Sequence, residues 1–145
     1  MSKLNDYNCV VEHVDKSDEL LISRFLTVVG ISPARNGFRL LKEAIIIYSK
    51  GILKMSKVNE IIGIRNGITA LAVERNIRGA LNVAMDRNCL SRMNDIFSTH
   101  LLDASDRMTA KEFIATSAMY LLSDIANKRK LHENMSKMTY SKISI

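Results

Sequence analysis

The chain has 145 residues, of which 47% are hydrophobic and 25% are charged, as is usual for one globular domain. Its formal net charge of +6 favours a polyanionic partner, most often nucleic acid. The longest aliphatic run, AIII at 44–47, is far too short for a membrane-spanning helix, and the N-terminus has no signal-peptide pattern. With only two cysteines, Cys9 and Cys89, and no CxxC motif, we expect a reduced, cytoplasmic protein without membrane attachment.

The hydrophobic pattern predicts helices along most of the chain. β-branched residues lie at helical spacing and rarely alternate with polar ones, so strands are not expected. We therefore predict an all-α fold with a single domain of six helices at 17–130. Residues 1–16 and 131–145 are polar and weakly patterned, and we expect them to form an N-terminal arm and a C-terminal tail.

The first two predicted helices have clear ends. Ser17 is the expected N-cap of the first helix, and Gly30 ends it. The second begins near Ser32-Pro33, because proline is tolerated in a first helical turn, and Gly51 ends it. Their predicted buried stripes are Ile22, Phe25, Leu26 and Val29 in the first helix, and Phe38, Leu41, Ala44, Ile45 and Tyr48 in the second.

Two helices joined by a tight turn are predicted in the middle of the chain. A short helix at about 56–64 is followed by Asn66-Gly67, a strong turn signal, and Thr69 can cap the longer helix that comes next. A short helix, a turn with glycine and a longer helix form the helix-turn-helix pattern, here at about 56–88.

The last two predicted helices complete the domain. The fifth is short, starts near Ser91 and includes Met93, Ile96 and Phe97. The sixth opens with Thr109 and Glu112, which match a capping box. Its predicted buried stripe is Ile114, Ala118, Leu121, Leu122 and Ile125.

The helix predicted at 69–87 has two different faces. At 100° per residue, five apolar side chains fall within about 100° of arc, the width of a core-facing stripe. They are Val73, Ile77, Ala80, Leu81 and Ala84. The opposite side contains Leu71, Glu74, Arg75, Arg78 and Asn82.

The charged residues of that opposite side suit contacts with G·C base pairs. Arginine can bond bidentately to guanine O6 and N7, and glutamate can accept a hydrogen bond from cytosine N4. Between 54 and 92 there are seven Lys or Arg against three Asp or Glu, an excess that suits phosphate contacts. The alternative interpretation is a solvated helix face without a binding role, because arginines opposite an apolar stripe are commonly just that.

Three separate runs of sequence resemble one known family. VGISPARNGFRLLKEAI at 29–45 is similar to the start of the DNA-binding effector domain of the stage-zero sporulation protein A family, response regulators of endospore-forming Firmicutes. TALAVERNIRGALNVA at 69–84 resembles the recognition helix of that domain. TAKEFIA at 109–115 resembles the opening of its last helix, and the resemblance covers about 20–125 in all.

The resemblance implies an all-helical domain that binds double-stranded DNA, often as a head-to-tail dimer, on short boxes with a G·C-bearing core. It assigns base contacts to Glu74, Arg75 and Arg78. We expect backbone or auxiliary contacts from Arg65, Thr69, Leu71 and Asn82. It also implies a transcription regulator that works with RNA polymerase rather than an enzyme.

The chain departs from the family pattern in three places. Ala72 replaces an arginine of the family, so the preferred site differs or binding weakens. The segment at 98–108 corresponds to a basic region that is implicated in contacting the polymerase sigma factor, but here it contains Asp103 and Asp106. A phosphoacceptor receiver domain is expected to be absent, because residues 1–16 are too few to form one.

The leading prediction is a sequence-specific transcription regulator that acts as an effector domain without a receiver domain. An alternative is a protein–protein antagonist that pairs with a full-length sporulation response regulator and blocks its assembly on DNA. A third is nonspecific DNA binding, which would show a steep salt dependence without sequence preference.

Because His13, His100 and His132 lack the spacing of metal ligands, we expect neither a metal nor another cofactor.

Overall fold

The computed structural model describes residues 15–122 and 125–143, and all the regular secondary structure in these residues is helical. The helices are α2 (Lys16–Val28), α3 (Asn36–Ser49), α4 (Met55–Asn66), α5 (Ala70–Asp86), α6 (Arg92–Phe97), α7 (Ala110–Leu121) and α8 (Ile125–Ile143). The all-α prediction is therefore confirmed for the described residues, and helices α2 to α7 correspond to the six predicted helices. The predicted N-terminal arm falls mainly on residues 1–14, which lie outside the described residues.

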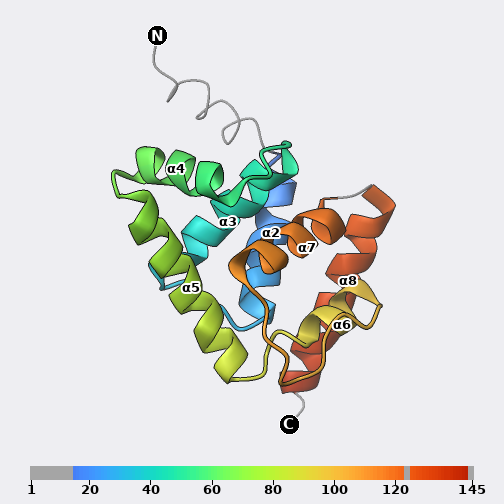
Figure 1. Ribbon diagram of the computed structural model, residues 1–145. Coiled ribbons are helices and arrows are strands. Elements are labelled where there is room, and N and C mark those ends of the chain that lie inside the picture. The colour runs from blue at the N-terminus through green and yellow to red at the C-terminus, as the bar shows by residue number, and fades with distance from the viewer. Residues whose placement is uncertain (1–14, 123–124, 144–145) are drawn as a thin grey trace.

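Helix α3 lies at the centre of the domain. It packs against α2, α4, α5 and α7. In Figure 1, α4 and α5 form one side of the molecule, and α6 and α8 form the opposite side. Helix α5 is therefore an edge helix, with one face toward the core and the other toward solvent. Within the described residues, no helix combines the length and the apolar character that crossing a membrane requires.

The core is built around stacked aromatic rings from three helices. The ring of Phe25 on α2 lies 5.4 Å from that of Phe97 on α6 and 5.9 Å from that of Phe113 on α7, measured between centroids. Such offset pairs add about 0.5–1.5 kcal/mol to the burial of the rings themselves. All four residues of the stripe predicted for the first helix are buried, which confirms the helical periodicity from which the stripe was predicted. On α3, the outer stripe residues Phe38 and Tyr48 are only half-buried.

The structure corrects the start of two predicted helices. Asp15, not Ser17, is the N-cap of α2, because its carboxylate accepts a hydrogen bond from the Ser17 backbone N–H at 2.8 Å. Helix α3 begins at Asn36 rather than near Ser32-Pro33. The Ser32 hydroxyl accepts from the Ala34 N–H at 3.2 Å and its carbonyl from the Arg35 N–H at 3.1 Å, so this segment forms a turn before the helix.

The structure also corrects the C-terminal end. The last predicted helix was expected to extend to Ile125, but α7 ends at Leu121 and a separate helix, α8, follows. Helix α8 includes most of the region predicted as a tail at 131–145. It buries Leu131 and Met135, one helical turn apart, against the core. The apolar residues of this stretch are few and widely spaced among polar ones, so they give only a weak periodicity, and the pattern alone did not predict this helix.

Hydrogen bonds attach α8 to two other helices. Arg24 on α2 lies 3.0 Å from His132 Nδ1 and donates to the Ser136 hydroxyl at 2.7 Å. Asn134 donates from its side-chain amide to the Ile96 carbonyl of α6 at 2.9 Å. Helix α8 is thus an integral layer of the fold on the side away from α5.

Candidate nucleic-acid interface

The connection between α4 and α5 is a tight turn that requires glycine twice. Gly67 ends α4 in the left-handed region, with φ of 68°, and its N–H donates to the Gly63 carbonyl. A Cβ on Gly63 would lie 2.6 Å from the Ile68 carbonyl oxygen, so only glycine permits this approach of the turn to α4. Thr69 then caps α5, and its side chain accepts from the Ala72 N–H at 3.0 Å. The predicted helix, turn and capped helix are therefore all present.

Helix α5 is divided into the two faces that its sequence predicts. The five residues of its apolar stripe are buried, and they pack toward α3 and α4. The other side presents Leu71, Glu74, Arg75 and Arg78, which together are called the exposed face of α5 from here on. Leu71 is 55% exposed, and the side chains of Glu74 and Arg78 are 44% and 61% exposed. All four belong to the N-terminal half of the helix.

The two arginines of the exposed face differ in their partners. Arg78 Nη2 donates to Glu74 Oε1 one helical turn earlier. Exposed pairs of this spacing contribute only about 0.3–0.5 kcal/mol, so Arg78 can exchange Glu74 for another acceptor at little cost. Arg75 is exposed and has no hydrogen-bond or ion-pair partner among the described residues. Its donors are therefore available to a ligand without breaking any internal contact.

Arg65, which the sequence suggested as an auxiliary contact, is directed elsewhere. Its Nε lies 3.2 Å from Glu43 Oε1 on α3, and its side chain is only 16% exposed. Asn66 donates to the other carboxylate oxygen of Glu43 at 2.8 Å. The end of α4 is thus tied to α3, and the structure does not bring Arg65 to the exposed face of α5.

Asn82, another suggested auxiliary contact, also has an internal partner. Its side-chain oxygen accepts from Arg107 Nη2 at 3.2 Å, while Arg107 Nη1 lies 3.1 Å from Asp86 Oδ1. Arg107 belongs to the segment just before α7, so these contacts join the second half of α5 to that segment. Of the four suggested auxiliary residues, Thr69 and Leu71 lie beside the base-contact candidates, whereas Arg65 and Asn82 have structural partners.

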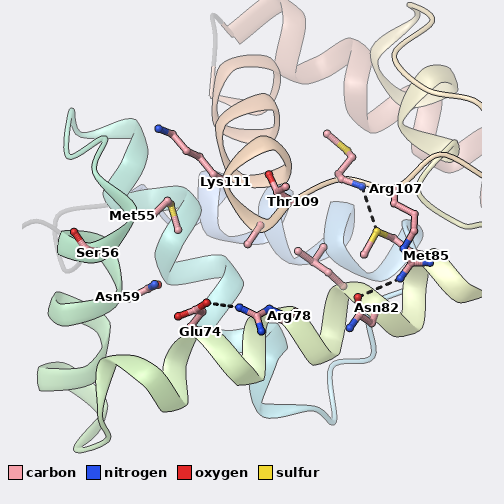
Figure 2. Close-up of a pocket in the computed structure, with 13 residues that line it drawn as sticks. Met55, Ser56, Asn59, Glu74, Arg78, Asn82, Met85, Arg107, Thr109 and Lys111 are labelled. Atoms are coloured by element: carbon pink, nitrogen blue, oxygen red, sulfur yellow. Dashed lines mark hydrogen bonds and ion pairs between the residues drawn. The ribbon is translucent and has the colours of Figure 1, made fainter.

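A groove of about 580 Å³ lies between α5, the start of α4 and the start of α7. Figure 2 shows Glu74, Arg78 and Asn82 along its α5 side, and Thr109 and Lys111 across from them. The groove contains residues that sequence reasoning missed as site candidates, namely Ser56, Arg107 and Lys111. No sequence signal connects Ser56 with Arg107 and Lys111, since only the packing of α4, α5 and α7 brings these two parts of the chain together.

The capping box at the start of α7 affects the charge near this groove. The Thr109 hydroxyl accepts from the Glu112 N–H at 3.1 Å, and the Glu112 carboxylate accepts from the Thr109 N–H at 3.1 Å. Hydrogen bonds from the Thr109 backbone and side chain lower the pKa of Glu112 below its ordinary value. Glu112 is therefore ionised at neutral pH, and its carboxylate is bonded to the N-terminus of α7.

Histidines and acids do not gather into a metal site in the described part of the chain, where no three potential ligands come together. His100 lies 3.2 Å from Asp103 at the surface, and His132 is bonded to Arg24. Both are used in contacts between side chains rather than in a shared cluster.

Comparison with known proteins identifies the domain. The model of one family, Sporulation initiation factor Spo0A C terminal, matches residues 22–121. Curated proteins provide no match to the chain. The matched segment starts in α2 and ends with α7, so it contains the helix-turn-helix and leaves α8 outside. Because this match covers more than half of the residues, the chain belongs to the Spo0A C-terminal family, the DNA-binding effector domains of sporulation regulators.

Proposed function

We propose that the protein is a sequence-specific regulator that inserts the N-terminal half of α5 into the major groove of double-stranded DNA. The observation that supports this most directly is the exposed face of α5, which places Glu74, Arg75 and Arg78 on the solvent side of a capped helix after a tight turn. In helix-turn-helix proteins, this half of the second helix meets base edges.

Each side chain of the exposed face has a role in this proposal. Arg75, which has no partner among residues 15–122 and 125–143, bonds bidentately to the O6 and N7 of a guanine. Glu74 accepts from the N4 amino group of a cytosine, and this exchange releases Arg78 for a second guanine or a phosphate. Leu71, exposed at the first turn of α5, contacts a thymine methyl group.

We further propose that residues 15–143 bind DNA without a phosphorylated receiver domain. The supporting observation is that the exposed face of α5 is already assembled in this domain, with Thr69 capping the helix and the apolar stripe packed on α3 and α4. Within residues 15–143, no rearrangement is needed to expose Arg75 to a ligand.

The test is selection of duplexes from a randomised pool by the purified chain, followed by affinity measurements on the enriched and a scrambled duplex at about 150 mM salt. We expect an enriched motif with G·C pairs and tighter binding to it than to the scrambled duplex. Arg75→Ala should weaken binding to the enriched duplex by about 5- to 150-fold, since a good bidentate contact discriminates by about 1–3 kcal/mol.

The matched control is Arg129→Ala, which removes an exposed arginine from α8 on the opposite side of the molecule. It should leave the preference between the two duplexes unchanged. Absence of an enriched motif, or an Arg75→Ala protein that binds both duplexes as the wild type does, would contradict the proposal. In that case pairing with a full-length sporulation regulator, which predicts co-purification with it, becomes the function to test.

A further inference from the structure

The groove between α5 and the start of α7 adjoins the exposed face of α5. Glu74 and Arg78 belong to both, because they line the groove from the α5 side. Figure 2 shows that the groove runs from Met55 and Ser56 at the start of α4 to Met85 and Arg107 at its other end, with Lys111 on the far side. Anything that contacts Arg78 from the solvent therefore lies at the entrance to this groove.

The side chains that line the groove suit a phosphodiester strand. Three cations, Arg78, Arg107 and Lys111, face one acid, Glu74. Lys111 is exposed and has no hydrogen-bond or ion-pair partner in the part of the chain that the structure describes. The lining also includes the apolar side chains of Met55, Leu81, Met85 and Met108, of which Leu81 and Met85 are buried. Cations beside apolar side chains suit a strand whose phosphates alternate with deoxyribose rings, because most protein contacts with DNA are to phosphate and sugar.

Arg107 is held in place but retains free donors. Its Nη1 and Nη2 atoms bond to Asp86 and Asn82 at 3.1 and 3.2 Å. A guanidinium has five N–H groups in a fixed plane, so donors remain after these two bonds. Two acceptors on α5 thus fix the orientation of the guanidinium plane. Because the side chain is already ordered, phosphate binding would cost less side-chain entropy.

We propose that this groove holds one sugar–phosphate strand of the DNA duplex that α5 enters, and that Lys111 and Arg107 donate to its phosphates. The inference rests on the proposed function, because the strand belongs to the same duplex. It adds a second contact region from a different part of the chain, formed by α7 and the segment before it. Phosphate contacts of this kind fix the position of a protein on DNA and contribute affinity without sequence preference.

The first experiment compares Lys111→Ala with Lys130→Ala. Both remove one exposed lysine, but Lys130 lies on α8, on the opposite side of the molecule from α5. Affinities are measured over a series of salt concentrations on the selected and the scrambled duplex. We expect Lys111→Ala to weaken binding to both duplexes by the same factor and to reduce the slope of log affinity against log salt by about 0.9. Lys130→Ala should change neither.

The second experiment makes the groove more positive, whereas Lys111→Ala makes it less positive. Asp86→Asn removes the charge that partly neutralises Arg107 and retains an oxygen that can accept its hydrogen bond. We expect tighter binding to both duplexes and a steeper salt slope. Asp95→Asn, the same change at an exposed acid on α6, is the control for net charge and should have a smaller effect. Inorganic phosphate should compete only weakly with the duplex, since a free anion takes the place of only one phosphate of the strand.

The outcomes separate this inference from the proposed function. If the wild type selects a motif through Arg75, while Lys111→Ala and Asp86→Asn behave as their controls do, the groove inference is overturned and the function stands. If Lys111→Ala weakens only the selected duplex, Lys111 is not a phosphate contact and the inference is overturned as well. If the wild type binds neither duplex, both fail together. Unfolding midpoints in urea confirm that each variant is folded.

Discussion

Arg65 and Glu43 form an ion pair between helices α4 and α3, with 3.2 Å between Nε and Oε1, although their side chains are only 16% and 10% exposed. Asn66 completes the group by donating to the second carboxylate oxygen. Charges removed from water in this way are stable only while every partner remains. The pair therefore fixes the end of α4, and with it the turn that precedes α5.

Removal of Glu43 should destabilise the protein strongly. In Glu43→Ala, Arg65 loses the ion pair and Asn66 loses one of its two acceptors, keeping the Ile62 carbonyl, and we expect the free energy of unfolding to fall by about 3 kcal/mol. Urea denaturation gives this value from the shift in midpoint. The control is Glu60→Ala, which removes an exposed carboxylate 3.7 Å from Lys57 and should cost less than about 1 kcal/mol. Equal losses in the two variants would show that the Glu43 group is not structurally important.

Two glycines on facing helices should respond to alanine in opposite directions. A Cβ on Gly37 of α3 would lie 2.5 Å from the Asn76 carbonyl oxygen and 2.6 Å from the Ala80 Cβ on α5. Gly37→Ala must therefore push α5 away, and we expect a loss of about 1–3 kcal/mol in the free energy of unfolding. Gly79 on α5 has open space around it, so Gly79→Ala should stabilise the helix by about 0.5–1 kcal/mol. Thermal unfolding of both variants measures the two effects, and a neutral Gly37→Ala would contradict the close packing of α3 on α5.

The Thr69 hydroxyl caps α5, and two substitutions test this role. Thr69→Ala removes the acceptor for the Ala72 N–H and should cost about 1 kcal/mol of stability. Thr69→Ser keeps the acceptor and should restore the wild-type value within a few tenths of a kcal/mol. Chemical denaturation of the two variants tests this. If serine fails to restore stability, the hydroxyl is not the group that matters.

Helix α8 should contribute substantially to stability, although its sequence is mostly polar. Leu131 is 2% exposed, and Leu131→Ala should lower the free energy of unfolding by about 2–5 kcal/mol, the usual cost of truncating a buried leucine. Met119→Ala on α7 is the control, since Met119 is 65% exposed and its loss should have little effect. Urea denaturation compares the two. A Leu131→Ala protein as stable as the control would mean that α8 is not part of the cooperative unit.

The contact between Arg24 and His132 should make the attachment of α8 depend on pH. Arginine only donates, so His132 Nδ1 accepts at 3.0 Å and the ring is neutral. Burial and then the Arg24 charge lower the pKa of His132 below its ordinary value of 6.5. The folded protein thus binds this proton less readily than the unfolded chain. The contribution of neutral His132 to the free energy of unfolding is complete above pH 6.5. It is lost as the pH falls through the lower pKa that His132 has in the folded state.

The measurement is the urea midpoint at about pH 7.5 and about pH 5.5, a window chosen around the ordinary histidine pKa. We expect the wild type to lose stability at the lower pH. His132→Gln, which has no titrating group, should lose less over the same interval. A parallel decline in the two proteins would assign the effect to other groups.

Much of the fold and part of the site followed from the sequence. Six helices were predicted, and the stripe of α5 from Val73 to Ala84 is buried as expected, because helical periodicity alone decides which residues share a face. The caps at Thr69 and Thr109 were also correct. Each depends on a hydrogen bond to a residue three positions away, which the local chain geometry already provides. The exposure of Arg75 and Arg78 is another consequence of this periodicity.

Contacts between distant segments could not be predicted in this way. Arg65 is bonded to Glu43 and Arg107 to Asp86, pairs that are 22 and 21 residues apart in the chain. Whether such side chains meet depends on how α3, α4, α5 and the segment before α7 pack, and no spacing in the sequence encodes those distances. The burial of Leu131 on α8, a helix that packs against α2 and α6, is another example. Local hydrogen bonds and periodicity are set by neighbours along the chain, whereas the groove and α8 exist only because the packed core brings separate helices together.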